Sequence, residues 1–234
     1  MWIILSLLIL SNQSARADDT SQAESVNIDA IKQKYWARGD ETELGVVQNR
    51  AYSKGHRFEL GAFGGVTFSD PFLSTNQTGL DLGYHFTENL GLHLIAWKSF
   101  VSPSSALDTF EREKHATTNT NYPKNFVGVE GMGSVLYGKL SVLGKSIIYY
   151  DLHGLVGVGS MGTESGRYIA PSLGVGQRFY FGKLVSLRID YRLMYYRETI
   201  LEKQIVTQLG QPTGSRDNWS NVITLGLSFL IGGE

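Results

Sequence analysis

Acidic and basic side chains of this 234-residue chain lie inside otherwise apolar segments, where an isolated charge is costly to desolvate. Carboxylates and arginines in such places can act as acids, bases or ligands, or they can neutralise one another as ion pairs. Both signs are present, as a paired network requires. We therefore expect an internal salt-bridge network. Its predicted members are Glu59, Asp81, Glu130, Asp151, Arg178, Arg188, Asp190 and Arg192.

Three histidines lie in the same segments and raise the question of metal binding or catalysis. His85 and His93 lie on two segments joined by a three-residue turn, close enough to interact, and His153 lies further along the chain. Two imidazoles without a fixed third ligand are a weak metal signal. We interpret these histidines as hydrogen-bonded interior residues, and we predict neither a metal nor another cofactor.

Motifs of known enzyme classes are weak or missing in the full sequence. Gly157-Val-Gly-Ser-Met-Gly162 matches a dinucleotide-binding pattern, but a strand-like segment follows it where that motif requires a helix. Neither G-x-S-x-G nor H-E-x-x-H occurs. His115 is the one histidine in a long loop, where a lipid-modifying hydrolase would need it. We predict that the protein is not an enzyme, and the hydrolase stays the less favoured alternative.

The elements that must position these side chains are strands. From residue 57 onward, hydrophobic residues alternate with small or polar ones, which predicts half-buried strands. The predicted strands cover residues 57–68, 77–86, 90–100, 125–137, 147–159, 169–181, 185–197 and 218–230. Short links alternate with long ones, which is typical of an antiparallel up-and-down transmembrane β-barrel. We predict this all-β fold for residues 57–230, with the short links on the periplasmic side.

Alternation alone does not say which face of the strands points outward. In the seventh predicted strand, Leu187 and Ile189 alternate with Arg188 and Asp190. A soluble barrel with an apolar interior gives the same alternation. However, the second face is rich in Gly, Ser and Thr, and aromatic residues gather at the strand ends as they do in membrane girdles. These features favour lipid outside the barrel and charges inside it.

The interior of an eight-stranded barrel is just wide enough for side chains to fill it. We therefore expect the charged residues to close the lumen. A three-residue turn over 87–89 sets Phe86 opposite Leu90, so that the apolar residues of both strands share one face. Across a later turn, Arg178 falls opposite or diagonal to Asp190, and either position allows contact.

The N-terminal part of the chain has a different composition. Residues 1–17 combine a short apolar run with the small-residue pattern Ala15-x-Ala17, which predicts a secretory signal peptide cleaved near Ala17. Residues 18–56 are polar and form a predicted periplasmic leader, with helical spacing over about 27–37. The sequence contains no cysteine, which excludes a disulfide framework.

The leader carries a motif that resembles a known family. The segment Lys34–Lys54 reads KYWARGDETELGVVQNRAYSK. It is similar to the YW…ELxVVQNRxYxK leader of the Gram-negative outer membrane β-barrel domain proteins, which are small OmpA-type barrels. The likeness continues through Arg57–Leu60, Leu82–Phe86, Tyr137–Ser141 and Tyr150–Leu152. This resemblance implies a bacterial outer-membrane location and eight strands, and it brings no established catalytic residues.

Together these features predict an outer-membrane barrel with a structural or partner-binding role in the cell envelope. Apolar residues of the leader are expected to dock a periplasmic or other envelope protein, or to cap the barrel mouth. They are Tyr35, Trp36, Leu44 and Val47. Membrane lipid is the other expected partner, whereas scattered Lys and Arg and a net charge of -1 argue against nucleic acid. A narrow channel for small solutes is the alternative function.

Overall fold

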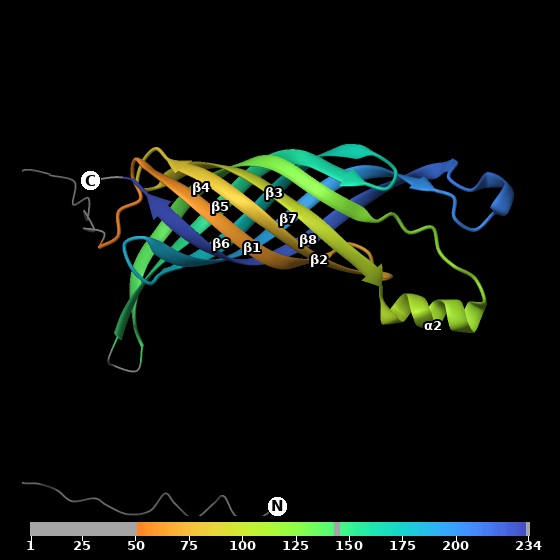
Figure 1. The fold of residues 1–234 in the computed structure, drawn as a ribbon, viewed down its shortest axis with the longest axis horizontal. Coiled ribbons are helices and arrows are strands. Elements are labelled where there is room, and N and C mark those ends of the chain that lie inside the picture. The colour runs from red at the N-terminus through yellow and green to blue at the C-terminus, as the bar shows by residue number, and fades with distance from the viewer. Residues whose placement is uncertain (1–50, 143–145, 233–234) are drawn as a thin grey trace, which may run out of the picture. The chain divides into compact units, whose positions relative to one another are not determined.

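Eight antiparallel strands close into a barrel within the part of the chain that the computed structural model describes, residues 51–142 and 146–232. Each strand pairs with the next one in the sequence, and the last strand returns to pair with the first (Figure 1). The strands are β1 (Arg57–Phe68), β2 (Leu73–His85), β3 (Leu90–Pro103), β4 (Pro123–Val142), β5 (Ser146–Thr163), β6 (Arg167–Tyr180), β7 (Val185–Leu201) and β8 (Pro212–Ile231). Closure gives every strand a paired neighbour on both sides, whereas a strand with a wholly unpaired edge could not be tolerated in lipid. The predicted eight-stranded barrel is confirmed.

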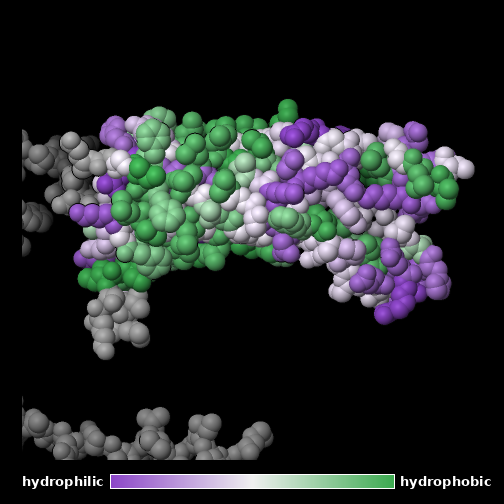
Figure 2. Space-filling view, in the orientation of Figure 1, coloured by the Kyte–Doolittle hydropathy of each residue, from purple (hydrophilic) through white to green (hydrophobic). Residues whose placement is uncertain are grey.

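The outer surface of the barrel is apolar and its interior is charged. Ile189 and Leu225 are 41% and 54% exposed, whereas Arg188 and Asp190 on the same strands' inner side are buried. Figure 2 shows a broad band of hydrophobic residues across the visible face of the barrel, with hydrophilic residues beyond it at the end that carries the helix. Exposed apolar residues of every strand, among them Leu60, Leu82, Leu94, Val129, Val158, Val175, Ile189 and Leu225, continue this band as a belt. Exposed apolar side chains around buried charges suit a bilayer and exclude the soluble arrangement. Among the described residues, no helix is long and apolar enough to cross a bilayer.

The two ends of the barrel differ in their connections. The tight turn between β2 and β3 has the predicted register, because the Phe86 amide donates to the Leu90 carbonyl oxygen at 3.0 Å. His85 lies opposite Gly91 in the same hairpin. We call this the short-turn end, and we call the opposite end, where β3 is joined to β4 and β7 to β8, the long-loop end.

The strands at the long-loop end run further than the alternation predicts. β2 begins at Leu73, and β7 and β8 pair outward to Leu201 and Pro212. These outer residues lie beyond the hydrophobic belt, so their polarity no longer alternates although their backbone pairing continues. In these three strands, the alternation of apolar and polar residues therefore identifies the part that crosses the membrane and not the full length of the strand.

Two helices in the links between strands were not predicted. Within the link over 101–124, residues Ser105–Lys114 form α2 (Figure 1). The Ser104 side chain caps its first turn by accepting from the Leu107 amide, and Leu107 is buried. His115 ends the helix in the left-handed conformation, with φ of 53°. A second, single-turn helix, η1 (Val206–Gln208), lies in the link between β7 and β8.

The hairpin of β4 and β5 projects beyond the short-turn end of the barrel (Figure 1). β4 pairs with β3 only from Asn125 to Gly133, but it continues along β5 as far as Val142. A register shift after Ser134 places Val135 outside the ladder at the point where the hairpin leaves the barrel. The predicted turn at this site includes residues 143–145, which lie outside the described residues.

An arginine on the lipid face should destabilise the barrel. We expect Leu225→Arg, on the exposed apolar face of β8, to lower the free energy of unfolding by up to about 2–4 kcal/mol, the range for such a charge at the bilayer midplane. Val206→Arg is the matched control, because Val206 is 81% exposed in η1, outside the barrel ladder. Urea unfolding of protein refolded into phospholipid vesicles measures both. Equal stability of the two variants would contradict the assigned lipid face.

Candidate functional site

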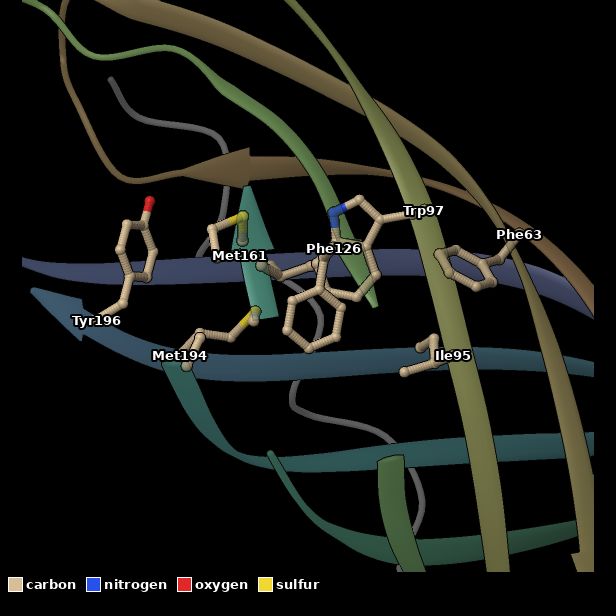
Figure 3. Close-up of a cluster of buried hydrophobic side chains, with 9 residues drawn as sticks. Phe63, Ile95, Trp97, Phe126, Met161, Met194 and Tyr196 are labelled. Atoms are coloured by element: carbon tan, nitrogen blue, oxygen red, sulfur yellow. The ribbon is translucent and has the colours of Figure 1, made fainter. Parts of the chain in front are cut away.

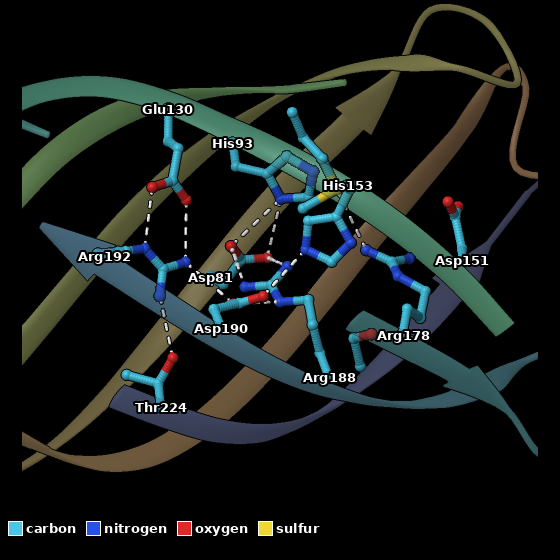
Figure 4. A network of polar contacts seen from close by, with 12 residues as sticks. Asp81, His93, Glu130, Asp151, His153, Arg178, Arg188, Asp190, Arg192 and Thr224 are labelled. Atoms are coloured by element: carbon cyan, nitrogen blue, oxygen red, sulfur yellow. Dashed lines mark hydrogen bonds and ion pairs between the residues drawn. The ribbon is translucent and has the colours of Figure 1, made fainter. Parts of the chain in front are cut away.

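The side chains predicted to form a salt-bridge network all point into the lumen. The closed ladder gives every second residue of a strand an inward direction, so strand parity alone places them there. All are at most 5% exposed, and they come from six different strands (Figure 4). Ion pairs connect seven of the predicted residues, and the eighth, Asp151, pairs with Lys54 instead. The seven are Glu59, Asp81, Glu130, Arg178, Arg188, Asp190 and Arg192.

Glu59 on β1 is the centre of this network. Arg178 of β6 donates to it with both terminal nitrogens, at 2.7 Å to Oε2 and 2.9 Å to Oε1. Arg188 of β7 adds a third contact at 3.3 Å to Oε1. β1 and β6 are not neighbours in the barrel, so the forked ion pair reaches across the lumen.

Two further arginines extend the network along the lumen. Arg188 also binds Asp81 at 3.0 Å and Asp190 at 2.8 Å. Arg192 contacts Asp190 at 3.0 Å and forks onto Glu130, with both nitrogen–oxygen distances at 2.9 Å. Each buried charge therefore has at least one opposite charge within hydrogen-bonding distance, which offsets its desolvation.

Arg178 lies diagonal to Asp190, which is one of the two predicted positions, but its hydrogen bonds go to other residues. Arg178 lies directly opposite Arg188 in the ladder, and Asp190 lies opposite Gly176. The hydrogen bonds of Arg178 go to Glu59 and to the Met132 sulfur instead. Pairing along a hairpin considers only adjacent strands, whereas a long side chain in a narrow lumen can reach strands further round the barrel.

Each lumen histidine is hydrogen-bonded to a carboxylate of the network. His85 Nε2 lies 2.7 Å from Glu59, His93 Nδ1 lies 3.0 Å from Asp81, and His153 Nε2 lies 2.9 Å from Asp190. The rings pack over glycines of neighbouring strands. A Cβ at Gly91, for example, would come within 2.6 Å of the His85 ring, so glycine is required there for space.

A metal at this place would compete with the network. Glu59, His85 and His93 each offer a ligand atom, and these atoms lie within 4.8 Å of one another. However, both oxygens of Glu59 already accept from Arg178, and His93 Nδ1 already contacts Asp81. A divalent cation would have to displace guanidinium groups and would add positive charge beside them. The arrangement suits ion pairing better than metal binding.

The short-turn end of the lumen is closed by a residue that the sequence analysis missed. Lys54, just before β1, is 1% exposed; its Nζ pairs with Asp151 and donates to the Ser134 hydroxyl at 2.6 Å. The Glu88 carboxylate holds this segment by accepting from the Lys54 amide at 2.9 Å. Strand periodicity does not extend to Lys54, so the alternation gave no reason to place its side chain in the lumen.

Aromatic rings complete the closure beside Lys54. The Tyr52 ring stacks on Tyr180 with centroids 5.5 Å apart and meets the edge of Tyr149 at 5.1 Å. Tyr137 and Leu230 belong to the same buried cluster. Residues 51–56, the end of the predicted leader, thus fold into the barrel mouth, while Tyr35, Trp36, Leu44 and Val47 lie outside the described residues.

Towards the long-loop end, the lumen is filled by apolar side chains (Figure 3). Trp97 stacks on Phe126 with ring centroids 4.2 Å apart, and Phe63 packs against the Trp97 edge at 6.3 Å. The buried cluster contains Phe63, Ile95, Trp97, Phe126, Met161, Ala170, Met194, Tyr196 and Val222. This cluster was not predicted from the sequence, although Trp97 and Ile95 lie on the same face of β3 as His93.

Above the apolar cluster, a second polar group joins the outer parts of four chain segments. Glu198 on β7 accepts from Arg216 at 2.8 Å and from Asn121 at 2.7 Å. Arg216 also donates to Asp70, in the link between β1 and β2, at 3.0 Å. The lumen is therefore occupied by side chains at successive levels from one end to the other.

His115 does not have the surroundings of a catalytic base. It caps α2 and is exposed, and among the described residues no side chain is hydrogen-bonded to its imidazole. An imidazole that activates a nucleophile is normally held by a third group. The predicted alternative of a lipid hydrolase therefore gains no support from this residue.

The chain is similar to solved outer-membrane barrels at low sequence identity. The N-terminal β-barrel domain of Pseudomonas aeruginosa OprF is 13% identical, with 76% of this chain and 98% of that chain covered and a TM-score of 0.42. OprG from the same organism is 11% identical, with 78% and 99% covered and a TM-score of 0.41. Neisserial surface protein A is 10% identical, with 74% and 96% covered and a TM-score of 0.38. No protein-family model and no curated protein matches the chain.

The geometry of the chain itself defines its class. Eight tilted antiparallel strands, a closed ladder, an apolar outer belt and a charged, filled lumen are the features of a small transmembrane barrel of the outer-membrane type. The expected resemblance to small OmpA-type barrels is confirmed at the level of the fold.

Removing the charge of Glu59 should destabilise the barrel strongly. Glu59→Gln leaves Arg178 buried without its carboxylate, and breaking a buried pair in this way costs about 3–5 kcal/mol. The matched control is Glu113→Gln, on the exposed face of α2, which we expect to change stability by less than about 0.5 kcal/mol. Urea unfolding in vesicles distinguishes them. A Glu59→Gln variant as stable as the control would show that the network is not a stabilising core.

Proposed function

We propose that the protein is a non-enzymatic outer-membrane barrel with a structural or partner-binding role in the cell envelope and a lumen closed to solutes. The observation that carries this proposal is the packing of the lumen. Lys54, the ion pairs around Glu59 and the stacked rings of Trp97 and Phe126 occupy successive levels of the interior. An interior of this kind leaves binding at the two ends and along the outer wall as the ways in which the protein can act.

The long-loop end supports a partner-binding role. Ile205, Val206 and Leu209 are exposed on the link around η1, beyond the hydrophobic belt. Apolar residues that lie outside the membrane and are exposed to water favour protein contact. Figure 2 shows this hydrophobic patch among hydrophilic residues at the end of the molecule that carries the β7–β8 hairpin.

The predicted leader supplies the second candidate contact. We propose that the protein is exported with a signal peptide removed near Ala17, and that Tyr35, Trp36, Leu44 and Val47 then dock a periplasmic partner or the barrel mouth. The support is that the end of the leader, from Tyr52 to Lys54, already packs into the short-turn end. Intact-mass measurement of the mature protein locates the cleavage site.

A closed lumen predicts no steady conductance. Purified protein in planar bilayers should give no stable current steps, because no solute can pass the buried ion pairs without breaking several of them. A large, reproducible conductance from the unmodified protein would favour the narrow channel instead. The Glu59→Gln variant, which weakens the central level, is expected to show brief current openings that the Glu113→Gln control lacks.

The leader proposal predicts a specific crosslink. A photoreactive amino acid in place of Trp36 should trap a discrete envelope protein or the barrel itself in intact cells, because an apolar leader residue that docks lies against its partner. The same probe in place of Gln33, a nearby polar position, is the control. Equal or absent crosslinking at both positions would count against docking through Trp36.

A further inference from the structure

The ladder between β6 and β7 ends earlier than the strands do. Pairing begins at Tyr180 and Ser186 and stops at Ser172 and Met194, although β6 continues outward to Arg167 and β7 to Leu201. β6 remains paired with β5 over this outer stretch, and β7 remains paired with β8. The barrel wall therefore divides between β6 and β7 towards the long-loop end.

Pro171 accounts for the position of this division. It is the first β6 residue beyond the last pair with β7, and proline has no amide hydrogen to donate to a ladder. A side-chain contact replaces the missing backbone pairs further out, where the Thr199 amide donates to the Tyr168 hydroxyl at 3.0 Å. The division is thus built into the sequence of β6, and the contact between Thr199 and Tyr168 bridges it.

A groove of about 490 Å³ lies on the outer wall at this division. It is lined mainly by outward-facing side chains from four strands, Val156, Pro171, Leu173, Leu193, Tyr195 and Trp219. Its volume lies within the range of small-molecule sites, about 300–1,000 Å³. The inner side is closed by Met194, which is fully buried beside the stacked rings of the apolar cluster. A ligand would therefore lie along the outside of the barrel and would not pass into the lumen.

The chemistry of the groove changes along its length. Leu173 and Leu193 lie at its inner part, within the hydrophobic belt. Tyr195 and Trp219 follow towards the long-loop end, with ring centroids 4.9 Å apart. Amphipathic rings of this kind lie at the level of lipid headgroups. The groove thus runs from the hydrocarbon region to the membrane interface, as a bound lipid chain would.

Two arginines stand beyond the aromatic pair, one on each side of the division. Arg197 on β7 has the same outward parity as Tyr195, and Arg167 on β6 has the same outward parity as Pro171. The Arg197 side chain is 68% exposed, its Nε and Nη2 donate to the Ser215 hydroxyl at 3.2 and 2.9 Å, and its carboxylate partner Asp217 is 3.9 Å away. A neutral hydroxyl and an exposed carboxylate at that distance hold the guanidinium weakly, so its other N–H groups can bind another anion. Arginine binds phosphate oxygens with particular strength because its planar fork donates two hydrogen bonds.

We propose that the groove between β6 and β7 binds one phosphorylated membrane lipid of the leaflet at the long-loop end. One acyl chain lies on Leu173 and Leu193, the interfacial part of the lipid packs against Tyr195 and Trp219, and the phosphate contacts Arg167 and Arg197. The order of apolar, aromatic and cationic side chains matches the order of groups in such a lipid. This inference rests on the membrane-spanning fold and does not depend on the proposed role of the leader or the loops.

Photo-crosslinking with a lipid of defined structure tests the site. The full mature protein is reconstituted into phosphatidylcholine vesicles that contain increasing fractions of phosphatidylglycerol with a diazirine on its acyl chain. Labelled peptides are then mapped. We expect labelling of the β6–β7 region to saturate at low probe fraction, and labelling of the face of Ile189 and Leu225 to rise in proportion to the probe.

Variants separate the acyl and headgroup parts of the site. Leu193→Trp fills the groove and should reduce the saturable labelling about tenfold. Ile189→Trp, on the same strand but nearer the short-turn end, should leave the labelling unchanged. Replacing Arg167 and Arg197 together by Gln should weaken it by about tenfold or more, because charge-assisted hydrogen bonds are lost. Arg112→Gln, on exposed α2, is the control for charge alone.

Each outcome decides the proposal. Saturable labelling that both groove and arginine variants reduce supports it. Labelling of all faces in proportion to the probe would show bulk lipid only and would overturn it. Recognition of the phosphate would be overturned if the double arginine variant showed the same saturable labelling as the unmodified protein. It would also be overturned if diacylglycerol with a diazirine on its acyl chain, which has no phosphate, gave equal saturable labelling. Urea unfolding of each variant in the same vesicles shows whether it retains the barrel.

Discussion

The barrel depends on the rule that a charge held away from water needs an opposite charge beside it. Glu59 satisfies this rule for two arginines from β6 and β7, and it does so from β1, across the lumen. The contact joins strands that share no backbone hydrogen bonds. If the strands shifted by one residue, the charged set would face lipid, so the network also fixes the register of the whole ladder.

The side chains at the two ends of the lumen shield the central ion pairs. Lys54 and the tyrosine cluster protect the ion pairs from water at one end, and the rings around Trp97 protect them at the other. The apolar cluster around Trp97 lies inside a barrel whose exterior is also apolar, so the strands at this level carry hydrophobic residues on both faces. Polarity therefore does little here to fix which face of a strand points inward. Pro171 ends the β6–β7 ladder in the same region.

Sequence reasoning located the interior residues but not their partners. Strand parity identified the eight charged side chains, since alternation with period two assigns each residue to one face. It could not assign Arg178 to Glu59, because that choice depends on side-chain reach across a closed cylinder. It also missed Lys54 and the helix α2, which lie outside the alternating segments and are held by contacts from distant parts of the chain.

The sequence by itself determined the number of strands, their inner and outer faces and the register of the β2–β3 turn. These features depend on residue order along one or two neighbouring strands, so local periodicity is sufficient to define them. Only the tertiary structure decided which charges pair, how the lumen is sealed and where the wall divides. Those depend on the curvature and closure of the barrel, which bring together residues more than a hundred positions apart and which no local pattern records.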